Sequence, residues 1–291
     1  MATQQKIQSG ATGRTEGFEF EETLKHSFNN RNYPGFKIVD AKQVVPGSIA
    51  PTARNKNDLI LESSTSQHGI SVKNPKTSST TIQMQIIYKE KLLAQLNSVK
   101  EVPQDVIEFF NLFFGGNLEE DCQRLGIDYT SLEYKNERRR DRALWDSIPE
   151  RYKASFLDYF NDPQVKKETL EIVLKRGVTA LAGSDFMVWC DSSVAGKSNV
   201  DNLVAYRVDS LISDICKSYT WTPSYHNGIC SALYLGPVAL QMKGSGKGKS
   251  YHSPQFRMSL SAALTKCPKV KVLKGSCHSV VPCLSALPER A

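Results

Sequence analysis

The 291-residue sequence lacks several features that define common protein classes. It has no run of about 18 or more apolar residues, so we expect no membrane span. The N-terminal stretch MATQQKIQSGATGRTEG is polar and has no apolar core of a secretory signal, which favours a cytoplasmic protein. The seven cysteines include no C-x-x-C pair. We therefore expect no zinc ribbon or dithiol redox motif, and we expect the cysteines to be reduced.

Motifs of several enzyme classes are also missing. The sequence has no G-x-S-x-G nucleophile elbow and no H-x-x-x-H pair of metal ligands. The segment GSGKGKS ends in Gly248-Lys249-Ser250, but a phosphate-binding P-loop would also need glycine at position 243, where this chain has Lys243. No helical pattern follows the segment, because Pro254 interrupts it. We therefore expect no nucleotide cofactor.

Acidic residues are scarce in the last part of the chain, although the whole sequence carries a net charge of only +7. From Gly236 onward there are nine Lys or Arg residues and one acid, Glu289, so this segment carries +8 and residues 1–235 carry −1. A basic block on a nearly neutral body favours a polyanionic partner more than a uniformly basic surface would. A basic tail that only aids solubility would have the same composition.

The hydrophobic patterns predict a chain of mixed α and β structure. Helical spacing is found at residues 20–28, 82–96, 105–114, 145–160 and 163–176. Strand-like patterns are found at residues 36–39, on both sides of 63–69, and at 185–190, 202–208, 231–235, 238–243 and 255–260. This order predicts an α/β fold in which helices flank a mixed central sheet, with a helical insertion and a β-rich part toward the C-terminus.

The same patterns divide the chain into five contiguous parts. These are a flexible N-terminus (1–15), a core with the first helix and strands (16–100), a helical subdomain (101–180), a β-rich part (181–265) and a basic tail (266–291).

Two short apolar runs, NDLILE and GISVK, carry a carboxylate and an amine at one end of a predicted hairpin. If the first run is a strand, Asp58 and Glu62 share one of its faces, and in the second run Ser71 shares a face with Lys73. Pairing the runs brings Asp58 and Lys73 together at one edge of a sheet. A carboxylate there suits Mg²⁺, and a neighbouring amine can hold or help deprotonate a water that attacks phosphorus. The alternative is an ordinary hairpin with a surface ion pair.

These residues resemble the motif of the PD-(D/E)xK nuclease superfamily, and of type II restriction endonucleases in particular. That family places an aspartate at the start of one strand, (D/E)-x-K on the next strand and a glutamate on an N-terminal helix. In this sequence Asp58 follows Asn57 rather than proline, and the x-K portion is Val72-Lys73. The resemblance implies a restriction-endonuclease-like central sheet in which residues 16–100 form the catalytic core.

The N-terminal helix of the family also has a counterpart. The segment GFEFEETL at residues 17–24 is similar to the G-x-x-F-E-x-x-L pattern that opens many restriction enzymes. On this alignment Glu21 is the helix acid, which would orient Lys73 or a water, with Glu19 and Glu22 as alternatives.

Ser71 departs from the family pattern, which has Asp or Glu at this position as the second metal ligand. Some restriction enzymes similarly carry S-x-K and take the missing carboxylate from the helix after the lysine strand, and in this sequence that helix offers Glu90. Glu62 is an alternative because it shares a face with Asp58. The resemblance therefore implies a Mg²⁺ site with Asp58 and either Glu90 or Glu62 as ligands, and with Lys73 positioning or activating the water.

The glycine-lysine segment fits a loop between two strands, at 238–243 and 255–260. Glycines let a backbone approach a duplex closely, and a two-stranded ribbon fits the major groove. The side chains of this region that suit phosphate contact or base reading are Lys243, Lys247, Lys249, Arg257, Gln241, Ser245, His252 and Gln255. The alternative is a surface loop without a ligand. Some restriction enzymes have a similar late strand and loop, which supports double-stranded DNA as the partner.

The resemblance implies a type II restriction enzyme, which is a Mg²⁺-dependent, site-specific endonuclease that hydrolyses phosphodiester bonds in double-stranded DNA. Such enzymes commonly act as homodimers, because two-fold protein symmetry matches a palindromic site. Two other functions fit the same residues. One is a repair or recombination nuclease that acts on structured DNA, and the other is a non-catalytic DNA-binding protein with the same fold, which Ser71 makes credible.

Overall fold

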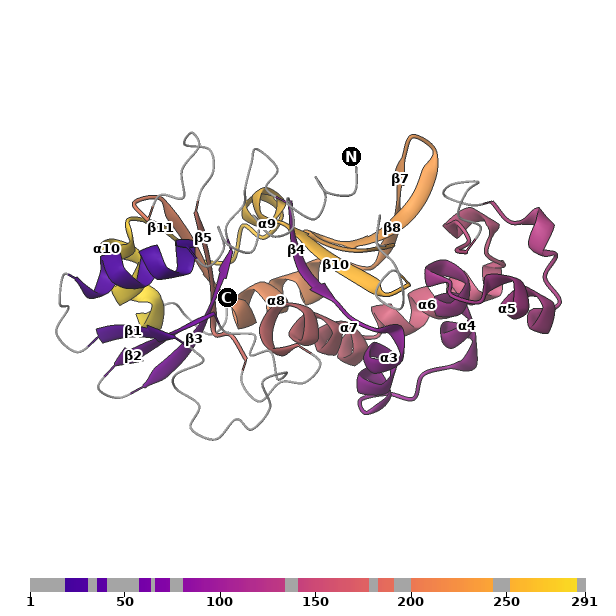
Figure 1. Cartoon of the computed structure of the whole chain (residues 1–291), viewed down its shortest axis with the longest axis horizontal. Coiled ribbons are helices and arrows are strands. Elements are labelled where there is room, and N and C mark those ends of the chain that lie inside the picture. The colour runs from indigo at the N-terminus through magenta and orange to yellow at the C-terminus, as the bar shows by residue number, and fades with distance from the viewer. Residues whose placement is uncertain are drawn as a thin grey trace. The chain divides into compact units, whose positions relative to one another are not determined.

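The computed structural model describes residues 19–30, 36–40, 58–63, 66–73, 81–133, 141–177, 183–190, 200–242 and 252–286, in two compact units (Figure 1). The first unit comprises residues 1–82, 174–214 and 267–291, and the second comprises residues 83–173 and 215–266. Each unit is assembled from separate stretches of the chain, whereas the five parts expected from the sequence were contiguous. The functional roles assigned to those parts stay predictions.

The first unit contains a six-stranded mixed sheet. In spatial order its strands are β1 (Phe36–Asp40), β2 (Leu59–Ser63), β3 (Gln67–Lys73), β5 (Phe186–Cys190), β6 (Leu203–Arg207) and β11 (Val272–Gly275). All neighbours pair antiparallel except β3 and β5, which run parallel. A parallel pair needs a long crossover connection, and residues 74–185 supply it. The predicted α/β fold with a mixed central sheet is confirmed.

One face of this sheet is packed against helices. Residues 19–29 are helical, and the stripe of Phe20, Leu24 and Phe28 is buried, as its spacing predicted. Burial of one such side chain contributes roughly 1.5–3 kcal/mol, so the stripe is enough to hold the helix in place. Alternate strand residues join the stripe in one core cluster, among them Leu59, Leu61, Ile70, Val72, Phe186, Val188, Leu203 and Ala205.

The predicted basic tail contributes to the same core. Its strand β11 forms the last strand of the sheet, paired with β6. The short helix α10 (Cys277–Val280) and the 3₁₀ turn η4 (Val281–Ala286) follow, and Cys277, Val280 and Leu284 are buried in the core cluster. Residues 272–284 are therefore part of the folded first unit.

Asn29 ties the end of the first helix to the sheet. Its side-chain Nδ2 donates to the carbonyl of Ile38 at 2.8 Å, and its Oδ1 accepts from the Ile38 N–H at 3.0 Å. The amide thereby satisfies both backbone groups of one β1 residue, as a neighbouring strand would. This contact fixes where the helix ends relative to β1.

The second unit contains a five-stranded sheet. The first two residues of its strand β4 are counted with the first unit. In spatial order its strands are β4 (Thr81–Ile86), β10 (Pro254–Ser259), β9 (Val238–Met242), β8 (Ile229–Leu235) and β7 (Thr222–His226). The β9–β10 and β8–β9 pairs are antiparallel. The turn between β7 and β8 has positive φ at Asn227 (51°) and Gly228 (75°), which is the Asn-Gly type I′ turn that fits a twisted hairpin.

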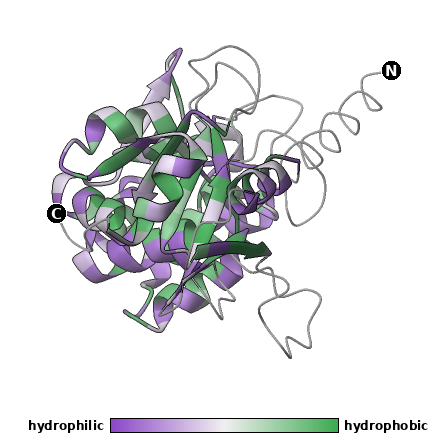
Figure 2. Ribbon diagram, turned by 90° about the vertical axis from the view of Figure 1, so that its left-hand side faces the viewer, coloured by the Kyte–Doolittle hydropathy of each residue, from purple (hydrophilic) through white to green (hydrophobic). Residues whose placement is uncertain are grey.

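The helices of the second unit surround an aromatic core. Besides α10, the helices after residue 88 in the described part of the chain are α3 (Lys89–Asn97), α4 (Gln104–Phe114), α5 (Leu118–Leu125), α6 (Glu150–Asn161), α7 (Pro163–Leu170), α8 (Val208–Ser218), whose residues 208–214 belong to the first unit, and α9 (Leu260–Lys266). A π-helical turn, η3 (Glu171–Arg176), continues α7, and short 3₁₀ turns occur at η1 (Tyr129–Ser131) and η2 (Trp145–Ser147). Phe109, Phe113 and Phe156 stack between α4 and α6, with ring centroids 4.3–5.2 Å apart. The helices carry alternating bands of hydrophobic and hydrophilic residues (Figure 2).

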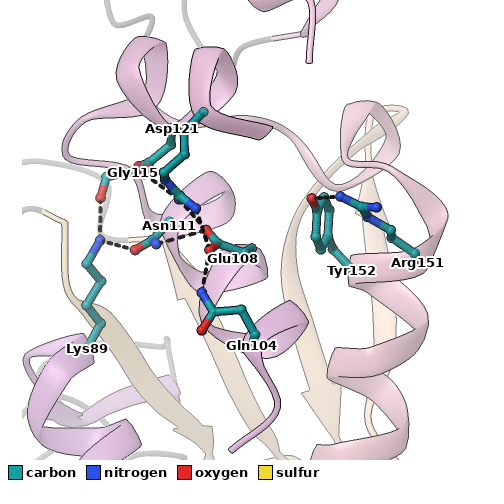
Figure 3. Close-up of polar contacts among 9 residues, drawn as sticks. Lys89, Gln104, Glu108, Asn111, Gly115, Asp121, Arg151 and Tyr152 are labelled. Carbon is teal, nitrogen blue, oxygen red and sulfur yellow. Dashed lines mark hydrogen bonds and ion pairs between the residues drawn. The ribbon is translucent and has the colours of Figure 1, made fainter. Parts of the chain in front are cut away.

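Helix α4 carries a buried carboxylate that its neighbours satisfy (Figure 3). Glu108 accepts hydrogen bonds from Arg124 through both carboxylate oxygens, from Gln104 at 2.5 Å and from Asn111 at 3.2 Å. These bonds, above all that from Arg124, hold the pKa of Glu108 below its usual range, although burial alone would raise it. The network joins α4 to α5.

Lys89 closes the far end of the same helix (Figure 3). Its Nζ donates to Asn111 Oδ1 at 2.9 Å and to the carbonyl of Gly115 at 3.1 Å. An ammonium group at a helix C-terminus stabilises the last carbonyls. Burial lowers the pKa of Lys89, and the nearby acids oppose that shift.

The prediction of a helix over residues 82–96 is wrong for its first third. Residues 81–86 form strand β4, and the helix begins only at Lys89. The sequence TIQMQI alternates strictly, so that Met84 is buried while Gln83 is exposed, which is a period of two rather than 3.6. Within the described residues, no helix combines the length and the apolar character needed to cross a bilayer.

Candidate functional site

The structure brings Asp58 and Lys73 together, as the hairpin pattern predicted. Strands β2 and β3 pair antiparallel with Leu59 opposite Ile70, and the Asp58 N–H donates to the Ile70 carbonyl at 2.9 Å. Asp58 therefore lies directly before β2, beside the C-terminal half of β3. The Lys73 Nζ is 3.3 Å from Asp58 Oδ2.

One oxygen of the Asp58 carboxylate accepts all of its hydrogen bonds. Oδ2 accepts from the Val72 N–H at 2.6 Å, from Ser71 Oγ at 3.3 Å and from Lys73 Nζ at 3.3 Å. Among the described residues no donor reaches Oδ1. The carboxylate is thus fixed in orientation by one oxygen, while the other is available to a cation or a water.

Lys73 also has a donor left over. Its Nζ donates to Asp58 Oδ2 and, at 3.1 Å, to the carbonyl of Val72. An ammonium has three N–H donors, so one has no partner in the part of the chain that the structure describes. The side chains of Lys73 and Asp58 are 19% and 25% exposed, so the pair is partly shielded but reachable from solvent.

Ser71 lies at the position where an acid was expected to bind metal. It is fully buried and its Oγ donates to Asp58, so its hydroxyl supports the first carboxylate instead of adding a second. In the residues that the structure describes, no group of three or more His, Cys, Asp or Glu side chains is placed to hold a metal ion. The donor set therefore fits a cation held by one carboxylate and completed by waters and substrate oxygens, which is a common arrangement for Mg²⁺.

The candidates for a second carboxylate lie in different places. Glu62 is four residues beyond Asp58, about 13 Å along the strand at ~3.3 Å per residue. It accepts a hydrogen bond from Gln67 at the turn end of the hairpin. Glu90 is exposed on α3 in the second unit, and Glu21 is half-buried on the helix of residues 19–29. The metal-binding and orienting roles of all three stay predictions.

A second polar cluster at the other end of β3 was not predicted. Asp185, directly before β5, accepts a hydrogen bond from the Gly69 N–H at 2.9 Å through Oδ2, and this oxygen lies 3.5 Å from His68 Nδ1. The ring of His68 packs edge-on against Phe186. His68 belongs to strand β3 and its side chain is partly buried. Asp185 is 116 positions from Gly69, so no local sequence signal could reveal the contact.

The predicted DNA-reading residues fall partly within the described structure. Gln241 on β9 and Gln255 on β10 are directly opposite each other, and Arg257 is opposite Ala239, so these three polar side chains share one face of the five-stranded sheet. His252 has Nδ1 3.2 Å from the Phe114 carbonyl oxygen, so its ring is engaged within the unit. Four further candidates lie outside the described residues, namely Lys243, Ser245, Lys247 and Lys249.

Comparisons with known proteins assign this chain to no family. No protein-family model matches the chain, and no curated protein matches it. Among solved structures, the restriction endonuclease MspI in complex with its cognate DNA is similar over 81% of this chain and 76% of that one, with 8% sequence identity and a TM-score of 0.39. A TM-score this low does not establish a common fold.

Proposed function

We propose that this chain is a Mg²⁺-dependent, sequence-specific endonuclease that cleaves double-stranded DNA, of the type II restriction kind and acting as a homodimer. The observation that carries the proposal is the pairing of Asp58 and Lys73 at adjacent strands of the central sheet, 3.3 Å apart, each with a polar atom available for a ligand. The PD-(D/E)xK resemblance of the same residues and the basic C-terminal segment support it.

The residues of the site suit phosphodiester hydrolysis. Asp58 would hold the cation through Oδ1, while Oδ2 stays bound to the β3 backbone and to Lys73. The remaining N–H of Lys73 would donate to the attacking water or to a phosphate oxygen. Ser71 and the Val72 N–H keep the carboxylate in one orientation. A bound divalent cation would neutralise the phosphate oxygens and lower the pKa of a bound water.

A second candidate function is a non-catalytic DNA-binding protein. It is favoured by the buried serine at position 71 and by the lack, in the described residues, of a cluster of three metal ligands. A repair or recombination nuclease would use the same site on structured DNA.

Incubation of the purified protein with plasmid DNA and Mg²⁺ distinguishes the three functions. The parent should give discrete bands, and Lys73→Ala should lose them. The matched control is Lys167→Ala, because Lys167 is an exposed lysine of α7 whose Nζ lies 3.7 Å from Glu171, one helical turn away. Smearing or cutting confined to junctions would support the repair nuclease. DNA binding without cutting in Mg²⁺ would support the binding protein and would contradict the nuclease proposal.

A further inference from the structure

The five-stranded sheet is unusual in the charges of its strands. None of the strands β4, β7, β8, β9 and β10 contains Asp or Glu, and the one Lys or Arg among them is Arg257. An exposed sheet face in a protein with 30 acidic residues would ordinarily carry some of them. A sheet without carboxylates does not repel a polyanion.

Glutamine side chains form a ladder across three strands of this sheet. Gln241 Nε2 on β9 donates to Gln255 Oε1 on β10 at 3.1 Å, and Gln255 Nε2 donates to Gln83 Oε1 on β4 at 2.7 Å. Each amide holds the next in one orientation, so that these flexible side chains have already lost much of the rotamer freedom that binding would otherwise remove.

Both ends of the ladder keep unused hydrogen-bonding atoms. Within the described residues, no partner reaches Nε2 of Gln83, which is exposed, or Oε1 of Gln241. Gln85 is two residues from Gln83 on the same face of β4, and its buried Oε1 has no hydrogen-bond partner in that part of the chain. Buried polar atoms without a partner are rare and call for an explanation. The ladder thus presents donors at one end and an acceptor at the other.

The chemistry of an amide selects one kind of ligand. Phosphate contacts are made mainly by cations and single donors, which fix position but carry no sequence information. An amide carries a donor and an acceptor side by side, which matches the N6 and N7 edge of adenine in the major groove, while Arg matches guanine. Arg257 lies on the same face as the ladder, two residues from Gln255.

We propose that the ladder of Gln83, Gln255 and Gln241 reads base edges of duplex DNA, and that Gln83 is a further specificity-determining residue. This inference rests on the proposed DNA-binding function. It adds a residue from β4, which lies in the chain far from the glycine-lysine segment, and it assigns sequence reading to neutral amides and not to the basic loop.

The test is a binding selection from a pool of random duplexes, followed by competition against non-specific DNA. Gln83→Ala and Gln241→Ala should lower affinity for the selected site roughly 10- to 100-fold and relax the preference at one base pair. Non-specific affinity and its salt dependence should stay unchanged, because no charge is removed. The matched control is Gln67→Ala, since Gln67 is an exposed strand glutamine of the first unit.

Melting curves identify any variant that fails to fold, and Gln83→Glu then replaces Gln83→Ala because it keeps the shape of the side chain. The added carboxylate should weaken binding to all sequences and shift the preferred base. If the parent binds selectively and the folded glutamine variants keep the same preference, the ladder inference is overturned while the proposed function stands. If the parent binds no duplex DNA, both are overturned.

Discussion

Replacing Asp58 in two ways should separate its structural role from its role in the site. Asp58→Ala removes the acceptor of the buried Val72 N–H, whose bond to Oδ2 is 2.6 Å long. An unsatisfied buried backbone donor costs about 1–3 kcal/mol. The lost ion pair with Lys73 adds no more than about 1 kcal/mol, because both side chains are partly exposed. We expect the free energy of unfolding to fall by about 1–4 kcal/mol.

Asp58→Asn keeps a side-chain oxygen that can accept from the Val72 N–H and removes only the negative charge. Its free energy of unfolding should therefore fall by no more than about 1 kcal/mol. Both variants lose the charged ligand for a cation, so DNA cleavage should fall at least about 100-fold in each, since the cation supplies several kcal/mol to the transition state.

Denaturant unfolding and plasmid cleavage in Mg²⁺, measured on the same preparations, check this prediction. The expected result is that cleavage is lost in both variants while stability is lost mainly in Asp58→Ala. Full cleavage by Asp58→Asn would refute the reasoning, because a neutral amide does not supply the negative charge on which the cation site is argued to depend. Equal destabilisation by the two variants would refute the account of the Val72 hydrogen bond.

Two further predictions concern the second unit and the glycine-lysine segment. Glu108→Gln should lower the free energy of unfolding at pH 7 by about 1.5–3 kcal/mol, because the charged bonds from Arg124 are lost. The folded state lowers the pKa of Glu108, so its contribution to the free energy of unfolding is present above the usual Glu range and is lost as the pH falls through the folded-state pKa. In thermal melts from pH 7 to pH 3, the variant should therefore lose less stability than the parent. Lys247→Ala with Lys249→Ala should reduce the slope of log affinity against log salt by up to about 1.8, and an unchanged slope in binding titrations would remove this segment from the DNA interface.

Local sequence patterns were sufficient to predict the elements whose conformation is set by neighbouring residues. The stripe of Phe20, Leu24 and Phe28 predicted a helix, and alternation in NDLILE and GISVK predicted the β2–β3 hairpin with Asp58 beside Lys73. Both predictions hold because hydrophobic periodicity and antiparallel pairing of adjacent strands are set by neighbouring residues.

The features that were missed depend on distant parts of the chain. The contact of Asp185 with Gly69 exists only because β5 pairs parallel to β3 after a crossover. The Gln83–Gln255 bond joins residues 172 positions apart. Strand β11 was missed because its sequence VLKG is short and lies in a lysine-rich segment, and its pairing with β6 decides its conformation.

The crossover also fixes an order of events during synthesis. The hairpin that carries Asp58 and Lys73 is made long before the strand that supports it, because β5 begins only at Phe186 and β11 at Val272. Pairing across such a separation is slow, because the entropy of closing a long loop must be overcome before the contacts form. A nascent or truncated chain that ends before β5 would hold both site residues without the sheet that positions them. Any nuclease activity of this protein would therefore arise only after synthesis had passed the end of β11 at Gly275.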